Sequence, residues 1–319
     1  MKIAITGANG FVGSTLLSSL QSRGFEPIAL VRKPFSKLGI EVRQVDYSQD
    51  ASISAALKDI DILIHNAGKT KTITKEEMFA ANIGLTQRIV SIINRLQHPL
   101  RLIYISSQAA AGPSTKRYPR QESDKPAPIS IYGKSKAIAE RVISQQCHQA
   151  YNIVRPCSVY GPRDRDFLSL FRLCKHGLNL QIGHAERPLN MIHVTQLADF
   201  ILLLITNPQV RNETFFATDL QVYTQGQVVS YIADAIGIKT KRIIIPQFAA
   251  GIAFKSGDIL GKLTHRAMVM NYDKYQEITA EAWLADNSKA IKLLGWNPSP
   301  HMPKLIEETY QWYLSNAWL

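Results

Sequence analysis

Cysteine is scarce in this sequence of 319 residues, which contains only Cys147, Cys157 and Cys174. The three are odd in number and form no C-x-x-C pair, which argues against a disulfide framework and predicts a reduced, cytoplasmic location. A signal peptide is not expected either, because the apolar start of the chain is broken at Thr6 and Gly7.

Long hydrophobic runs are missing as well. The best candidate for a membrane segment, residues 243–263, contains Pro246, Lys255 and Asp258, so we do not expect it to span a bilayer. We predict a helix that packs against the protein core, and a helix lying on a membrane surface is the alternative. A membrane is therefore not an expected partner.

Acidic residues are few: 25 Asp and Glu stand against 37 Lys and Arg, which gives a formal net charge of +12. The basic residues occur in short groups rather than in a long run interleaved with aromatic residues, so nucleic acid is not expected as a partner. The excess charge favours anionic cofactors and small-molecule substrates, and a merely solvated basic surface is the alternative.

The first informative pattern lies at the N-terminus. An apolar strand at residues 1–5 leads into a turn at residues 6–13, and a helical pattern follows at residues 14–23. The turn reads Thr-Gly-Ala-Asn-Gly-Phe-Val-Gly, and such a strand–turn–helix unit offers backbone N–H groups and the positive end of a helix to a pyrophosphate. We interpret it as a dinucleotide-binding turn, with an ordinary strand-to-helix turn as the alternative.

Short apolar runs alternate with helix-like stretches through the first half of the chain. The predicted strands cover residues 27–31, 41–45, 60–65, 100–105 and 151–155. The predicted helices cover residues 14–23, 53–58, 74–96 and 131–148. This alternation predicts an α/β fold with a doubly wound parallel sheet (Rossmann-like), helices on both faces and ligands at the carboxyl ends of the strands.

The alternation loosens after Arg155. A helix at 195–206 and a strand at 213–217 are predicted to return to the first sheet. We therefore expect a dinucleotide-binding domain at 1–165 that is rejoined by about 190–222, and a smaller, mixed C-terminal substrate-binding lobe made of residues 166–189 and 223–319.

Tyr132 and Lys136 open a predicted helix and lie four residues apart, hence on one face. A nearby ammonium lowers the pKa of a phenol from its usual value near 10, and the pair can then act as a general acid–base. Ser107 ends the preceding strand and can hydrogen-bond a substrate oxygen at the same sheet edge. An exposed helix start and a capping serine are the alternative interpretations.

In this order and spacing, these segments resemble the extended branch of the short-chain dehydrogenase/reductase superfamily, the NAD(P)-dependent epimerases, dehydratases and reductases. The resemblance covers nearly the whole chain. Its motifs are the glycine turn, Asp46, His65-Asn66-Ala67-Gly68, Asn82, Ser106-Ser107, Tyr132 with Lys136, residues 155–162, Met191-Ile192-His193-Val194 and Leu197-Ala198-Asp199.

The resemblance implies a role for each site residue. Tyr132 would be the acid–base, Lys136 would hold the nicotinamide ribose, Ser107 would orient the substrate oxygen, and Asn82 would support the lysine. His193 is expected to be structural, and no metal is expected. The expected cofactor-binding residues are Gly7, Asn9, Gly10, Phe11, Val12, Gly13, Arg32, Lys33, Asp46, Tyr47, Asn66, Ala67, Gly68, Lys136, Pro156 and Val159.

The end of the second strand bears on the choice of cofactor. Relatives that prefer NAD carry an acidic residue there, whereas this chain has Arg32 and Lys33. Both can pair with a 2′-phosphate, so we expect NADP(H) to be favoured over NAD(H). Two solvated basic residues are the alternative.

The resemblance predicts an NAD(P)-dependent oxidoreductase that transfers hydride at a secondary alcohol or carbonyl. Gln108-Ala109 stands where sugar 4,6-dehydratases place Asp-Glu, which disfavours dehydration, and the apolar loop at 109–113 is similar to that of reductases of apolar ketones. A nucleotide-sugar epimerase with transient oxidation is the alternative, for which Arg187 is a candidate diphosphate contact. A non-catalytic NAD(P)-binding scaffold or sensor is the alternative of another class. A homodimer through helices 74–96 and 131–148 is also expected.

Overall fold

The computed structural model describes residues 1–33, 39–264, 268, 271–299 and 301–319. Within these residues, seven parallel strands form one sheet in the order β10-β6-β5-β4-β1-β2-β3. This arrangement confirms the predicted doubly wound, Rossmann-like α/β fold. The strands are β1 (Lys2–Thr6), β2 (Glu26–Val31), β3 (Glu41–Gln44), β4 (Ile62–His65), β5 (Arg101–Ile105), β6 (Tyr151–Pro156) and β10 (Glu213–Ala217).

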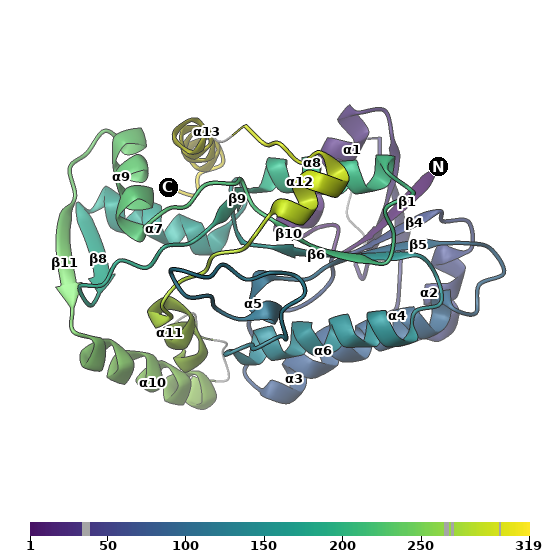
Figure 1. Cartoon of the computed structure of the whole chain (residues 1–319), viewed down its shortest axis with the longest axis horizontal. Helices are drawn as coiled ribbons and strands as arrows, with labels where there is room; N and C mark the ends of the chain where they lie inside the picture. Colours follow the sequence, from purple (N-terminus) through teal and green to yellow (C-terminus); the bar gives the residue numbers. More distant parts are fainter. Residues whose placement is uncertain (34–38, 265–267, 269–270, 300) are drawn as a thin grey trace.

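Helices cover both faces of this sheet (Figure 1). One apolar core joins the sheet to α1 (Phe11–Ser22), α8 (Val194–Thr206) and α12 (Ser288–Leu294). The other core joins it to α2 (Asp50–Leu57), α4 (Leu85–Ile93) and α6 (Ile131–Gln146). Burial from both sides explains why the central strands are continuous apolar runs rather than alternating ones.

The predicted helix at 74–96 is built from three pieces. α3 (Lys75–Phe79) and α4 are joined by a π-helical turn, η1 (Ala80–Gly84), which contains Asn82. The wider turn leaves the Asn82 side chain bonded to the loop after β4 rather than directed to solvent. Turns of this kind occur frequently at functional sites.

The C-terminal region adds two small parallel sheets and a third apolar core. β7 (Ser158–Tyr160) pairs with β9 (Met191–His193), and β8 (Leu178–Ile182) pairs with β11 (Lys241–Ile245). The third core lies among α7 (Arg165–Lys175), α9 (Gln225–Ile236) and α13 (Met302–Ser315). After β6 the chain leaves the large sheet, and it returns at β10.

The prediction of a single helix over residues 243–263 is wrong for its first residues. Ile243–Ile245 belong to β11, and α10 (Gln247–Thr264) begins only after Pro246. Three consecutive β-branched residues favour the pairing with β8, and proline lacks the N–H that would continue a helix. The last helix of this region before α12 is α11 (Tyr272–Thr279). None of the described helices is both long and apolar enough to cross a membrane.

Candidate active site

The glycine-rich turn brings the start of α1 close to the end of β1. Gly7 has a φ of +65°, and Gly10 donates its N–H to the Gly7 carbonyl at 3.0 Å. A Cβ added at Gly13 would lie 2.2 Å from that same carbonyl oxygen, so a side chain there would push the helix away. The turn therefore has the close approach and the free helix N-terminus that fit a pyrophosphate.

The loop after β4 is held against this turn by a buried polar network. The Thr6 hydroxyl accepts hydrogen bonds from the backbone N–H groups of Asn66 (3.1 Å) and Ala67 (3.0 Å). Its other contact is His65 Nδ1 at 2.8 Å, while His65 Nε2 contacts Thr86 at 3.1 Å. Burial lowers the pKa of His65 to about 3, so this imidazole is neutral and structural.

Ser107 and Tyr132 meet at the carboxyl edge of the sheet. Ser107 follows β5 and caps the short helix α5 (Gln108–Ala111), where its hydroxyl accepts the Ala109 N–H at 3.1 Å. Ser130 caps α6 through the Gly133 N–H at 3.0 Å and so fixes the start of the helix that carries Tyr132. The Ser107 and Tyr132 side chains both line the same cavity, and Ser107 acts on the Tyr132 phenol by lowering its pKa.

The electrostatics of Tyr132 differ from expectation. Burial raises its pKa to about 12, against the lowering effect of the Ser107 hydrogen bond and with a further rise from the Glu277 carboxylate. Lys136 is not among the groups that shift the pKa of Tyr132. Its ammonium donates instead to the Ile105 carbonyl (2.8 Å) and the Tyr104 hydroxyl (3.2 Å). The expected lowering of the phenol pKa by Lys136 is therefore not seen, because desolvation decides the direction.

Lys136 itself is buried and partly desolvated. Burial lowers its pKa to about 8, while the Glu140 carboxylate acts in the opposite direction. The ammonium also lies 4.6 Å from the centroid of the Tyr104 ring, a cation–π contact. Lys136 is therefore held in one place on the cavity wall, close to Gly68, where an added Cβ would lie 3.7 Å from Nζ.

Asn82 organises the neighbourhood of Lys136 without a hydrogen bond to it. Its amide donates to the Lys69 carbonyl (2.9 Å) and to the Ser135 hydroxyl (2.8 Å), and its Oδ1 accepts the Lys69 N–H at 2.8 Å. Ser135 precedes Lys136 on α6. The support of Lys136 by Asn82 stays a prediction, with Ser135 and the Lys69 loop as its structural route.

A single large cavity of about 3210 Å³ runs along this edge of the sheet. It is lined by most of the residues predicted to bind the cofactor or to act in catalysis: Gly7, Asn9, Gly10, Phe11, Val12, Arg32, Lys33, Tyr47, Asn66, Ala67, Gly68, Ser107, Tyr132, Lys136, Pro156 and Val159. Three predicted residues, Gly13, Asp46 and Asn82, are not part of the lining and lie behind it or beside it.

Asp46 is turned toward its own loop. Its carboxylate accepts hydrogen bonds from the Ser48 N–H (2.9 Å) and hydroxyl (2.6 Å), which lower its pKa. Tyr47 lines the cavity instead and donates its hydroxyl to the Leu30 carbonyl at 3.1 Å. The expected role of Asp46 in cofactor binding stays a prediction.

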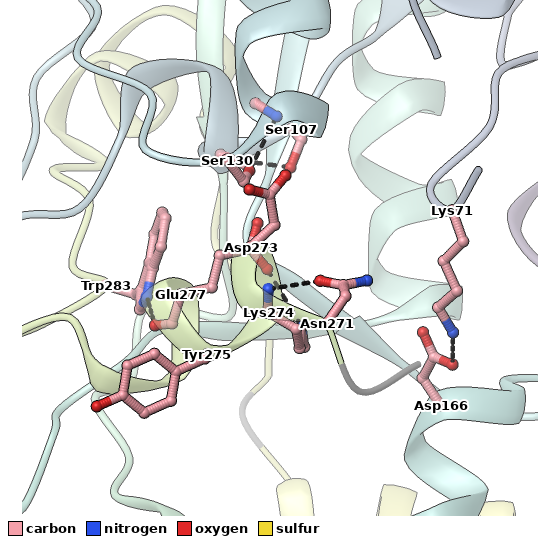
Figure 2. A network of polar contacts seen from close by, with 12 residues as sticks. Lys71, Ser107, Ser130, Asp166, Asn271, Asp273, Lys274, Tyr275, Glu277 and Trp283 are labelled. Carbon is pink, nitrogen blue, oxygen red and sulfur yellow. Dashed lines mark hydrogen bonds and ion pairs between the residues drawn. The ribbon is translucent and has the colours of Figure 1, made fainter. Parts of the chain in front are cut away.

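The C-terminal region supplies a carboxylate that the sequence did not reveal. Figure 2 shows the Glu277 side chain extending from α11 toward Ser107 and Ser130. Its backbone carbonyl accepts the Trp283 indole N–H at 2.8 Å, and Lys274 Nζ lies 3.3 Å from its carboxylate. One turn earlier on α11, Asp273 accepts the backbone N–H of Ile131 at 2.6 Å. Nothing in the local sequence around 272–279 marks the approach of Glu277 to Ser107 or the bond between Asp273 and Ile131, each of which joins segments more than a hundred residues apart.

A comparison with protein-family models identifies the chain. The model described as the NAD dependent epimerase/dehydratase family matches residues 3–216, well over half of the chain. The chain belongs to this family. It is therefore an NAD(P)-dependent oxidoreductase or epimerase of the extended short-chain dehydrogenase/reductase type, as the resemblance predicted.

Relatives of this epimerase/dehydratase-family enzyme match it over nearly its full length. A UDP-glucose 4-epimerase of Vibrio cholerae is 26% identical over 98% of the chain and 95% of its own length. A ceramide reductase of Caulobacter vibrioides is 26% identical over 99% of the chain and 96% of its own length. The solved structure of MoeE5 in complex with UDP-glucuronic acid and NAD has a TM-score of 0.79 at 20% identity, covering 99% of this chain and 100% of that one.

Two ion pairs of the family enzyme frame the site. Arg155 and Glu140 form a buried pair at 2.7 Å that ties β6 to α6, and the Ser106 hydroxyl donates to the same carboxylate. Lys71, in the loop after β4, pairs with Asp166 at the start of α7 (Figure 2). The first pair fixes the helix that carries Tyr132. The second joins two segments that both line the cavity.

His193 lies at the junction between β9 and α8. Its imidazole accepts the Thr195 backbone N–H and so caps α8, while the Gln196 side chain completes a capping box. Burial lowers the pKa of His193 to about 4. These contacts match the structural role expected for it.

Proposed function

We propose that this chain is an NADP(H)-dependent oxidoreductase that transfers hydride at a carbonyl or secondary alcohol, with Ser107, Tyr132 and Lys136 as its catalytic residues. The observation that carries the proposal is that Ser107, Tyr132 and Lys136 line the same cavity as the glycine turn. The groups that would bind the anionic cofactor and the groups that would transfer the proton therefore face the same cavity.

The residues present fit a nicotinamide dinucleotide. The cradle formed by Gly7 and Gly10 would hold the pyrophosphate, Lys136 the nicotinamide ribose, and Pro156 with Val159 the nicotinamide end. When bound, this cofactor supplies or accepts the hydride. Arg32 and Lys33, both exposed and both on the cavity wall, would read a 2′-phosphate, which is why NADP(H) is the proposed cofactor.

The protein's own residues then manage the substrate oxygen and its proton. The Ser107 hydroxyl would hold the oxygen of a carbonyl while the Tyr132 phenol, protonated at neutral pH, donates its proton to that oxygen. In the reverse direction the same phenolate would take the proton from an alcohol. Asn82 would act as a positioning residue through Ser135.

The substrate class proposed is a carbonyl compound with an apolar body. Beyond the catalytic residues the cavity is lined by Leu189, Met191, Phe254, Trp283 and Trp312. The ceramide reductase relative points in the same direction, since its name describes a reaction on a lipid.

A nucleotide-sugar epimerase is the second candidate, and a different part of the cavity favours it. Asn179, Gln181, Arg187, Gln225 and Arg242 give the far wall a polar, cationic character suited to a diphosphate. Arg187 donates to the Ile182 carbonyl at 2.8 Å, which holds its guanidinium in this wall. The UDP-glucose 4-epimerase relative supports this candidate.

Three further expectations accompany the proposal. The return of β10 to β6 supports a dinucleotide-binding domain at 1–165 that is rejoined by about 190–222, with 166–189 and 223–319 covering the substrate. A homodimer through the 74–96 and 131–148 helices, and a cytoplasmic location, rest on the sequence alone.

The proposed function is tested by a screen with two arms. In one arm NADPH oxidation is followed with long-chain ketones, and in the other UDP-glucose is incubated with NAD and its conversion to UDP-galactose is followed by NMR. We expect turnover in the first arm, and a loss of about 100-fold or more in the Tyr132→Phe variant with little change in NADPH affinity. Turnover in the second arm alone would select the epimerase. Failure of both arms despite tight dinucleotide binding would favour a non-catalytic scaffold.

A further inference from the structure

The outer face of α10 carries a stripe of large apolar side chains. Phe248 is 74% exposed, Ile252 64%, Ile259 62% and Leu263 74%. With 3.6 residues per turn, these four positions fall within an arc of about 60° around the helix axis. The apolar stripe, as we call these four residues, is therefore one continuous face and not a scatter of exposed residues.

The opposite face of α10 packs against α11, and these contacts fix the orientation of the helix. Phe254 packs against the Tyr275 ring of α11, with ring centroids 5.9 Å apart. Asp258 accepts the backbone N–H of Tyr272 at 3.0 Å, so the carboxylate is turned toward α11. Figure 1 shows α10 at the periphery of the molecule, with α11 on its inner side. Within the described residues, the apolar stripe faces away from the protein.

The segment of sequence that carries the stripe is rich in basic residues. Residues 239–264 contain five Lys and Arg and a single acidic residue, Asp258. Lys255 lies beside the stripe, with Nζ 5.1 Å from the centroid of the Tyr272 ring. Lys241 and Arg242 are exposed on β11, which leads into α10. A helix with an apolar face and basic residues around it is suited to the interface of an anionic bilayer.

We propose that the apolar stripe of α10 docks this enzyme onto an anionic lipid bilayer. The helix would lie in the plane of the interface, with its apolar side chains at the headgroup–acyl boundary and the basic residues among the headgroups. The inner face of the same helix lines the substrate cavity through Phe254, Gly257 and Gly261. Docking would therefore place the cavity beside the membrane, where apolar substrates are concentrated.

A second copy of the chain is a less suitable occupant of this face. A two-fold contact through the stripe would place each Lys255 and its basic neighbours against the same residues of the partner. Like charges facing each other at an interface cost free energy, whereas anionic headgroups neutralise them. A lipid surface is therefore the proposed partner of the stripe, and the experiment below distinguishes it from self-association.

The test is flotation of the full-length protein with vesicles. One set is phosphatidylcholine alone, and the other contains about 30% phosphatidylglycerol, which supplies the anionic headgroups. We expect binding to the anionic vesicles, weaker binding to the neutral ones, and a decrease as salt is raised. The Ile252→Asp/Ile259→Asp variant should lose at least about tenfold in binding, since it puts charge into the apolar face.

A matched control uses exposed apolar residues that lie outside α10. Tyr118 and Val222 are 66% and 55% exposed, and the Tyr118→Asp/Val222→Asp variant should bind vesicles like the wild type. Thermal unfolding and NADPH titration of each variant show that it is folded, and the NADPH oxidation assay tests the catalytic proposal independently of docking. Absence of vesicle binding, or equal binding by the α10 variant, would overturn the proposal. So would light scattering showing a dimer that the α10 variant converts to a monomer.

Discussion

Tyr132 keeps its proton in this site because its surroundings disfavour the phenolate. Burial and the Glu277 carboxylate both raise its pKa, and the hydrogen bond from Ser107 only partly offsets them. A phenol that is protonated at neutral pH is suited to donate a proton to a carbonyl oxygen, which is the direction of reduction. A protonated Tyr132 therefore agrees with the reductase proposed above.

The pKa of Lys136 leads to a prediction about cofactor binding. Burial lowers this pKa to about 8, so the ammonium loses its charge as the pH rises through that value. The dissociation constant of NADPH should therefore increase above about pH 8, by at most about tenfold per pH unit for one group. Calorimetry between about pH 6.5 and 9.5 measures this dependence.

Two variants separate Lys136 from its neighbours. Lys136→Met should bind NADPH weakly at every pH, without the increase above pH 8. Lys134→Met, an exposed lysine on the same helix, should keep the wild-type profile. A wild-type dissociation constant that stays flat across this range would show that Lys136 does not hold the cofactor through its charge.

Glu277 is predicted to act on the substrate and not on the cofactor. Its side chain is only 19% exposed and extends toward Ser107 and Ser130 (Figure 2). Glu277→Gln should raise the KM of the best carbonyl substrate by about tenfold or more, the worth of a charged hydrogen bond, and leave NADPH affinity unchanged. Glu281→Gln, at an exposed position, is the control. An equal loss of NADPH affinity would remove Glu277 from the substrate site.

At the scale of elements, the buried Arg155–Glu140 pair joins the strand and the helix on which the site is built. Both side chains are at least 93% buried. Removing one partner leaves an uncompensated buried charge, so Arg155→Met should lower the free energy of unfolding by about 3–5 kcal/mol. Arg95→Met, which breaks an exposed pair with Asp50, should cost at most about 1 kcal/mol. Denaturant titration measures the free energy of unfolding of both variants. Equal decreases would contradict the greater importance of the buried pair.

The elements of the first half could be predicted because each one is specified locally. Strands such as Ile62–His65 are short apolar runs buried on both faces, and helices such as Ile131–Gln146 begin at a capping serine. Local pattern did not predict the π-helical turn in 74–96, because the Asn82 contacts that accompany it come from a distant loop. It also failed at 243–245, where the partner strand β8 decides the conformation.

The sequence motifs predicted which residues line the candidate site, but they did not predict the pKa of Tyr132. Tyr132, Lys136 and Ser107 are adjacent in the cavity wall, as strand ends of a parallel sheet require. The direction of the Tyr132 pKa shift depends on burial and on Glu277, which is 145 residues away in the chain. No local pattern carries information across that separation, so the carboxylate was not predicted.

At the scale of the whole molecule, the C-terminal region completes a cavity that begins at the sheet. Strand ends and the start of α6 supply the glycine turn, Ser107 and Tyr132. Residues of β8, β11, α7, α9, α10, α11 and α13 line other parts of the wall. The net charge of +12 matches the anionic ligands proposed for the cavity, and the basic part around α10 matches the proposed lipid surface.

Calorimetric titration of the protein, stripped of bound nucleotide, with NADPH and with NADH tests the proposed NADP(H) dependence directly. We expect tighter binding of NADPH, and an Arg32→Ala variant that loses this preference because NADPH binding weakens far more than NADH binding. Binding of neither dinucleotide, or a clear preference of the wild type for NADH, would contradict the proposed cofactor.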